Sequence, residues 1–167
     1  MVAIRRAELA DADAIWRVHT RSIRALARDH YRPDQIDAWV AGLRPSLYHP
    51  LIADQRIWVT EQGAPLSAFV QLNARTGELE GLYVAPDHTG QGLGRRLVRF
   101  AEAQARQAGH VQIHLSAAAN AVAFYAHLGY RAVGRTTHCL PAGGQLECTD
   151  MQRGLPQDPA LRDKEPP

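Results

Sequence analysis

The sequence predicts an α/β fold, in which strands and helices alternate along the 167 residues. Two junctions in the second half of the chain support this prediction. A strand-like segment at 78–84 leads through a glycine-rich loop into a segment whose apolar residues recur at helical spacing. A short apolar strand at 111–115 then leads into another helix. Such alternation is typical of a sheet covered by helices.

Each expected element has a local signal. Asp11 or one of its neighbours is expected to cap the first helix, and Pro33 suits the first turn of the second. Residues 62–65 turn a hairpin, and residues 73–77 turn the chain into the next strand. The expected strands cover residues 3–6, 57–61, 66–72, 78–84, 111–115, 130–137 and 145–152. The expected helices cover residues 11–28, 33–42, 91–109 and 118–128.

The composition indicates one globular domain at residues 1–154, followed by a tail at 155–167 that is rich in proline and charge and is expected to be disordered. The net charge of +2 is spread evenly, which argues against a DNA partner, and the apolar runs are too short to span a membrane. Arg5, Arg6 and Glu8 interrupt the N-terminal segment, so no signal peptide is expected and a cytoplasmic location follows.

Two cysteines flank the glycine pair Gly143-Gly144 in the last hairpin. If these glycines form a two-residue turn, Ala142 pairs with Gln145 and Cys139 lies opposite Cys148. A cross-strand disulfide is then geometrically conceivable, but two reduced thiols are the expectation for a cytosolic chain.

The loop that precedes the helix at 91–109 indicates an anion site. Gly90, Gly92 and Gly94 free the backbone to turn, so the first helical N–H groups point into the loop without partners. These donors and the helix dipole together favour an anion. Arg95 and Arg96 in the first turn suggest a polyphosphate ligand or a chance surface pair.

Two other phosphate-binding motifs do not fit this loop. A dinucleotide fold places its glycines after the first strand with an acidic residue about 20 positions later, whereas this loop lies past mid-chain and residues 107–112 contain no acid. A P-loop requires a lysine after its glycines, and none is present here.

Two separate motifs lie at a characteristic distance from each other. The first runs from Leu82-Tyr83-Val84-Ala85-Pro86 to Thr89-Gly90-Gln91-Gly92-Leu93-Gly94, and the second runs from Asn120 through Tyr125 to Gly129-Tyr130. Together they resemble the GNAT superfamily of acetyl-CoA-dependent N-acetyltransferases, over about residues 3 to 153. The resemblance implies a mixed, twisted sheet flanked by helices, with a splay between two central strands and acetyl-CoA as co-substrate in the resulting cleft.

The resemblance also implies which residues bind the cofactor. They are Leu82, Tyr83, Val84, Thr89, Gly90, Gln91, Gly92, Leu93, Gly94, Arg95, Arg96, Asn120 and Tyr125. Thr89 stands where the family usually has arginine or glutamine, so that side-chain contribution to the phosphates is missing or comes from Arg95 or Arg96. Asn120 is expected to cap its helix, to contact the pantetheine arm, or to do both.

The activity that the resemblance implies is direct transfer of an acetyl group to a primary amine of a small molecule, peptide or protein. Tyr125 is the candidate partner of the departing thiolate, because a phenol keeps its proton at neutral pH; simple packing at a helix end is the alternative. Backbone N–H groups near 82–84 are expected to stabilise the carbonyl oxygen. Glu78 and Glu80 are candidate bases and are expected on the same strand face as Leu82 and Val84. Two alternatives stay open: the proton leaves through a water path, or the two glutamates form a solvated face without a catalytic role.

The acceptor site is expected to lie between the link of the first two helices and the last hairpin, with His30, Tyr31 and His138 as candidate residues. Two other functions stay open: a non-catalytic acyl-CoA-binding or sensing module, and an acetyltransferase that acts on tRNA or ribosomal protein. No metal site is expected, because His110 and His114 have no carboxylate or cysteine partners nearby. The edge strand of the last hairpin makes a homodimer possible.

Overall fold

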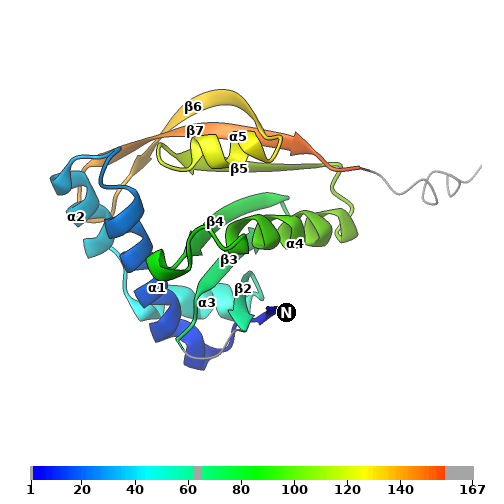
Figure 1. Ribbon diagram of the computed structural model, residues 1–167, viewed down its shortest axis with the longest axis horizontal. Coiled ribbons are helices and arrows are strands. Elements are labelled where there is room, and N and C mark those ends of the chain that lie inside the picture. Colours follow the sequence, from blue (N-terminus) through cyan, green and yellow to red (C-terminus); the bar gives the residue numbers. More distant parts are fainter. Residues whose placement is uncertain (1, 62–64, 157–167) are drawn as a thin grey trace, which may run out of the picture.

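The computed structural model describes residues 2–61 and 65–156 and arranges them as a seven-stranded sheet with helices on both faces (Figure 1). The strands are β1 (Ala3–Arg6), β2 (Ile57–Glu61), β3 (Ala68–Asn73), β4 (Glu78–Val84), β5 (Gln112–Ala118), β6 (Arg131–Cys139) and β7 (Gln145–Gly154). The helices are α1 (Ala12–Leu26), α2 (Pro33–Ala41), α3 (Tyr48–Ala53), α4 (Leu93–Gln107) and α5 (Val122–His127). Short 3-10 turns lie at η1 (Leu9–Asp11), η2 (Pro45–Leu47) and η3 (Pro86–His88).

The order of strands in the sheet is β1-β2-β3-β4-β5-β7-β6. Neighbouring strands run antiparallel except β4 and β5, which run parallel. Within the described residues, β4 and β5 share one registered pair, Glu78 with His114. β5, by contrast, pairs with β7 from Gln112 to Ala118. The two central strands therefore part soon after they meet, and the predicted mixed sheet with a central splay is confirmed.

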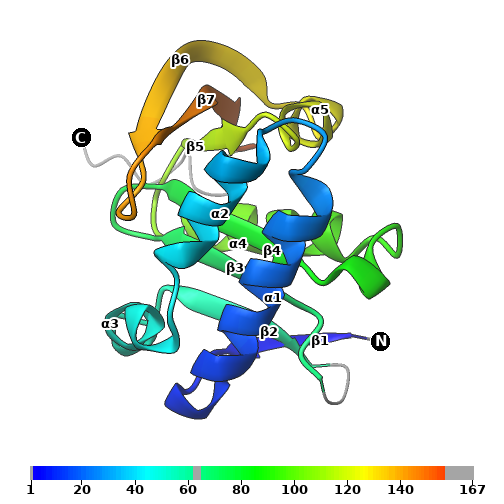
Figure 2. The ribbon, with the colours of Figure 1, turned by 90° about the vertical axis from the view of Figure 1, so that its left-hand side faces the viewer.

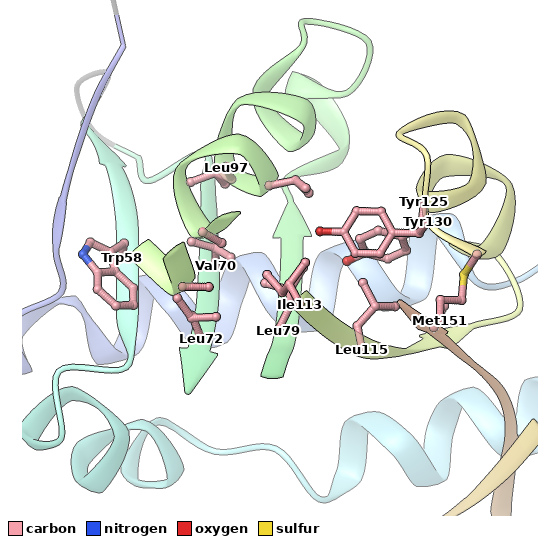
Figure 3. Close-up of a cluster of buried hydrophobic side chains, with 14 of the residues drawn as sticks. Trp58, Val70, Leu72, Leu79, Leu97, Ile113, Leu115, Tyr125, Tyr130 and Met151 are labelled. Atoms are coloured by element: carbon pink, nitrogen blue, oxygen red, sulfur yellow. The ribbon is translucent and has the colours of Figure 1, made fainter. Parts of the chain in front are cut away.

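Helices cover the two faces of the sheet in an unequal way (Figure 2). α1 and α2 lie on one face, where Ile15 of α1 packs against Phe69 of β3. α4 lies on the opposite face, where Leu97 packs against Val70 of the same strand. Because successive side chains of a strand point to opposite faces, β3 supplies apolar contacts to both layers. Figure 3 shows the core on the α4 side, with Tyr125 and Tyr130 at its margin.

Most of the expected elements are present, with three differences. α3 was not expected. β5 extends to Ala118 because it keeps pairing with β7 up to Cys148, so α5 begins at Val122 rather than at 118. α4 begins at Leu93, because Gly90 and Gly92 both adopt positive φ angles and lie outside the helix. The expected turn at 62–65 and the expected tail at 155–167 fall mostly outside the described residues.

The register that was expected for the last hairpin is wrong. Cys139 pairs with Gln145, and Cys148 lies opposite Thr136. The turn begins at Leu140, whose carbonyl accepts a hydrogen bond from the Gly143 N–H, so five residues rather than two join the strands. Both cysteines are free thiols, Cys139 exposed and Cys148 buried. β6 lies at the edge of the sheet, and pairing of two chains through this edge stays a prediction.

A buried polar group joins α4 to the end of β7. The Glu102 carboxylate accepts hydrogen bonds from Arg153 Nη1 at 2.7 Å and from the Tyr130 hydroxyl at 3.2 Å. The side chain of Glu102 is 10% exposed and that of Arg153 22%. Because a buried carboxylate is costly without its partners, these contacts fix α4 relative to the segment that follows α5.

We expect Arg153→Ala to lower the free energy of unfolding by about 3 kcal/mol, because it leaves a buried carboxylate without its main partner. Arg99→Ala is the matched control. The Arg99 Nη1 lies 3.9 Å from Glu102 Oε2 and its side chain is 51% exposed, so its loss should cost less than about 1 kcal/mol. Urea unfolding measures both values, and equal losses in the two variants would contradict this account.

Candidate functional site

A deep cavity opens where β4 and β5 part. We call it the splay cleft; its volume is about 860 Å³, and it is lined by residues 79–84 of β4 and 116–118 of β5. One end reaches the loop before α4 and the side chains of α5. The other end reaches apolar side chains of α1 and α2, including Ile23, Leu26 and Trp39. The cleft therefore connects both faces of the sheet.

The loop before α4 has the geometry of an anion site. Gly90 and Gly92 have φ angles of 75° and 78°, in the left-handed region that favours glycine. The first helical hydrogen bond runs from Arg96 N to Gly92 O, so the amides of the preceding turn remain directed out of the helix. A Cβ added at Gly90 or Gly92 would meet nothing within 4 Å, which leaves open space beside this backbone. Together with the dipole of a 15-residue helix, this arrangement favours a bound anion.

The polar side chains around this loop differ in whether they are free to contact a bound anion. Thr89 Oγ1 donates to Pro86 O at 2.9 Å, so its hydroxyl closes the η3 turn. Gln91 Nε2 contacts Asp87 O at 3.4 Å and does not line the splay cleft. Arg95 is exposed and lines the cleft, whereas Arg96 does not line it. Neither arginine forms an ion pair within residues 2–61 and 65–156.

A β-bulge in β4 changes which side chains face which layer. Leu72 of β3 lies opposite Leu79, and Gln71 lies opposite Gly81, so Glu80 is the extra residue. Leu79 and Leu82 consequently both pack into the α4-side core, although they are three positions apart. The prediction that Glu78 and Glu80 share a face with Leu82 and Val84 is therefore wrong.

The two candidate bases occupy different surroundings. Glu78 lies at the closed end of the splay, paired with His114, and does not line the cleft. Glu80 lines the cleft, but both of its carboxylate oxygens have partners: Arg56 Nη2 bonds to Oε1 and Gln71 Nε2 bonds to Oε2 at 2.7 Å. Both oxygens of Glu80 are therefore already engaged within the protein.

Tyr125 and Asn120 both line the splay cleft from the α5 side. Tyr125 is buried, with its ring 5.1 Å from that of Phe124 and 5.4 Å from that of Tyr130, both in edge-to-face contact. Figure 3 shows Tyr125 and Tyr130 next to each other on the α5 side of the core. Burial, with a smaller contribution from Tyr83, raises the pKa of Tyr125, so its phenol is protonated at neutral pH. Asn120 Oδ1 is buried and has no hydrogen-bond partner among the described residues.

Tyr83 lines the cleft from β4 and rests on a half-buried histidine, His19. The His19 ring lies 3.8 Å from the Tyr83 ring, and His19 Nδ1 is 3.0 Å from the Tyr48 hydroxyl. Burial lowers the pKa of His19 to about 3, so the ring is neutral at physiological pH. Burial also raises the pKa of Tyr83, as does the nearby Cys148. This cluster gives the cleft an uncharged wall on the α1 side.

The three candidate acceptor residues divide between two cavities. His138 lines the splay cleft, where its Nε2 lies 3.1 Å from Ser116 Oγ. His30 and Tyr31 instead line a second cavity of about 1150 Å³ between the start of α2 and the last hairpin. The Tyr31 hydroxyl is already engaged there, since it donates to Glu147 O and accepts from Ala119 N, each at 2.8 Å. Cys139 and Leu140 lie on the border of both cavities.

The structure brings most of the predicted cofactor residues together around the splay cleft. Those that line it are Leu82, Tyr83, Val84, Thr89, Gly90, Gly92, Leu93, Gly94, Arg95, Asn120 and Tyr125. Ser116 was missed, although a serine that alternates with buried residues of β5 was a usable signal. No group of three or more metal-ligating side chains occurs within the described residues, and none of their helices is long and apolar enough to cross a membrane.

Comparisons with known proteins agree with this geometry. A family model described as an acetyltransferase (GNAT) domain matches residues 27–140. A comparison with curated proteins finds no match. The solved GCN5-related N-acetyltransferase from Rhodopseudomonas palustris is 27% identical, with a TM-score of 0.85 over 92% of this chain and 95% of that chain.

Two further solved structures share the fold at lower identity. The PaiA N-acetyltransferase from Thermoplasma acidophilum, in complex with coenzyme A, is 18% identical, with a TM-score of 0.72 over 92% of this chain and 99% of that chain. The ribosomal-protein-S18-alanine N-acetyltransferase from Escherichia coli is 20% identical, with a TM-score of 0.62 over 95% of this chain and 96% of that chain.

The surroundings of His19, whose Nε2 is buried, predict how the stability of the fold depends on pH. The pKa of His19 is about 3 in the folded chain and about 6.5 in an unfolded one, so protons bind the unfolded state first as the pH falls. Stability from this residue is therefore constant above about pH 6.5 and is lost below it, by up to about 1.4 kcal/mol per pH unit. Between about pH 6 and about pH 4, we expect the free energy of unfolding of His19→Gln to fall less steeply with pH than that of wild type, as measured by urea unfolding. Parallel curves for wild type and variant would contradict the assignment.

Proposed function

The chain belongs to the GNAT acetyltransferase family, and we propose that it transfers the acetyl group of acetyl-CoA directly to a primary amine. The observation that carries the proposal is the splay cleft. It joins an anion site at the start of α4 to a buried phenol and then to a second opening on the α1 side. A phosphate-bearing thioester and an amine can therefore approach each other from opposite faces of the sheet.

The residues of the cleft fit acetyl-CoA in two places. The backbone at Gly90 and Gly92 is open to a pyrophosphate, and Arg95 at the rim adds a positive charge. The buried, unpartnered Asn120 Oδ1 fits an amide N–H of the pantetheine arm, because a buried carbonyl oxygen needs a donor. When bound, acetyl-CoA supplies an acetyl group activated as a thioester.

Two groups of the chain suit the chemistry of acetyl transfer. The N–H groups of Leu82 and Val84 point away from β3, toward the gap left by the parted strand, because the Ala85 N–H bonds to Ser67 O and N–H directions alternate along a strand. They are candidates to stabilise the carbonyl oxygen as negative charge builds on it. Tyr125 keeps its proton at neutral pH and can donate it in a hydrogen bond to the departing sulfur. The ion pair of Glu80 with Arg56 holds the bulged part of β4 and so supports the position of these N–H groups.

The acceptor's surroundings suggest an amine on an apolar body or chain. Ile23, Leu26, Trp39 and Leu43 form the α1 and α2 side of the cleft. The chain shares its fold with an enzyme that acts on a ribosomal-protein alanine, so a peptide amine belongs in the test. A suitable panel comprises phenethylamine, spermidine and a short peptide with a free N-terminal alanine.

We expect Gly92→Asp to weaken acetyl-CoA binding at least about tenfold, which corresponds to about 1.4 kcal/mol. The added carboxylate would face the phosphates at the helix N-terminus. Gly92→Asn is the matched control, because asparagine has the same shape and also tolerates a positive φ. Calorimetric titration measures both, and equal affinities for the two variants would contradict the anion site.

We expect Tyr125→Phe to lower kcat for acetyl transfer by about 100-fold while leaving acetyl-CoA affinity within about threefold. The phenylalanine keeps the edge-to-face packing and removes only the hydroxyl. Release of free CoA, followed across the amine panel, measures the rate. If wild type binds acetyl-CoA but no amine stimulates release, the chain is a non-catalytic binding module instead.

A further inference from the structure

Three polar side chains from the last three strands of the sheet form a connected row beside the splay cleft. Ser116 Oγ of β5 donates to Asp150 Oδ1 of β7 at 2.8 Å, and His138 Nε2 of β6 lies 3.1 Å from the same Ser116 Oγ. Ser116 and His138 both line the cleft. His138 is exposed at its mouth, so it can exchange protons with solvent.

The hydrogen-bond directions in this row fix the histidine tautomer. A carboxylate only accepts, so the single hydroxyl proton of Ser116 points to Asp150. His138 Nε2 must then be the donor to Ser116 Oγ. In the neutral ring the unprotonated nitrogen is consequently Nδ1, which is the atom that can take up a proton.

The other titratable groups that line the cleft are poorly suited to this task. On β4, Glu80 has both oxygens engaged, and burial raises the pKa of Tyr83. On β7, burial raises the pKa of the Cys148 thiol. Tyr125, His88 and Arg95 line the part of the cleft near α5 and the glycine loop, at the cofactor end, and Cys139 follows His138 in its own strand. The lining residues of α1 and α2 carry no titratable group.

We propose that His138, oriented by Ser116 and Asp150, is the general base that removes the first proton from the acceptor's ammonium group. This inference rests on the proposed acetyl transfer. His138 Nδ1 takes one proton from R–NH3⁺, and the positive charge on the ring is balanced through Ser116 by the Asp150 carboxylate. The freed amine lone pair forms the C–N bond as the C–S bond breaks, and the second amine proton ends on the CoA sulfur. The products are the acetamide, CoA–SH and one proton, which His138 passes to solvent.

The arrangement in the resting protein is tested by NMR without any acceptor. Two-bond ¹⁵N–¹H correlation spectra report the tautomer of each histidine ring, and comparison with His138→Gln assigns the His138 signals. We expect the Nε2–H tautomer in wild type and a mixture in Ser116→Ala. An Nδ1–H tautomer for His138 in wild type would overturn the proposal.

The catalytic role is tested by the pH dependence of acetyl transfer to the best amine among phenethylamine, spermidine and the alanine peptide. His138→Gln should lower kcat/KM about 100-fold near neutral pH, and the deficit should shrink toward about pH 10, where the amine loses its proton unaided. Ser116→Ala and Asp150→Asn should each lower kcat about tenfold. Ser116→Thr, which keeps the hydroxyl, should have a kcat close to that of wild type. His127→Gln, an exposed histidine on α5 outside both cavities, is the matched control.

The outcomes distinguish the proposal from its alternatives. A deficit in His138→Gln that stays constant with pH indicates a purely structural role and overturns the assignment as base. Undiminished activity in His138→Gln overturns it as well. If wild type acetylates no amine of the panel, the proposed function itself fails, whatever tautomer His138 adopts.

Discussion

The rest of the site depends on one interruption of hydrogen bonding, the parting of β4 from β5 after Glu78 and His114. Each strand has a complete partner on its other side, β3 for β4 and β7 for β5. Each of the two strands therefore keeps hydrogen bonds to its other neighbour where β4 and β5 part. The gap between them leaves backbone donors of β4 facing a cavity, where a bound carbonyl oxygen can use them.

Burial also determines which ionisable groups around this gap can change their protonation state near neutral pH. Tyr83, Tyr125 and Cys148 are all pushed toward their protonated forms because charge is costly away from water. His19 is held neutral for the same reason. In the mechanism that we propose, proton uptake therefore falls to the exposed margin of the cleft. His138 sits at that margin with its ring oriented from behind by a hydroxyl and a carboxylate.

Local sequence signals predicted the parts of the site that depend on backbone conformation. The glycines before α4 need positive φ angles, and that requirement is visible in the sequence. Non-local features were not predictable in this way. The bulge at Glu80 arises from the pairing of β3 with β4, and it moved two glutamates to the other face. The row of His138, Ser116 and Asp150 joins three strands that only the folded sheet brings together, and the hairpin register depended on where Leu140 begins the turn.

The most direct test of the splay cleft as the cofactor site is a titration of the ¹⁵N-labelled chain with CoA, followed by backbone amide chemical shifts. We expect the largest changes at residues 90–95, before and at the start of α4, and at residues 82–84 and 116–121 on either side of the gap. Changes confined to the second cavity, around His30, Tyr31 and the start of α2, would contradict this expectation.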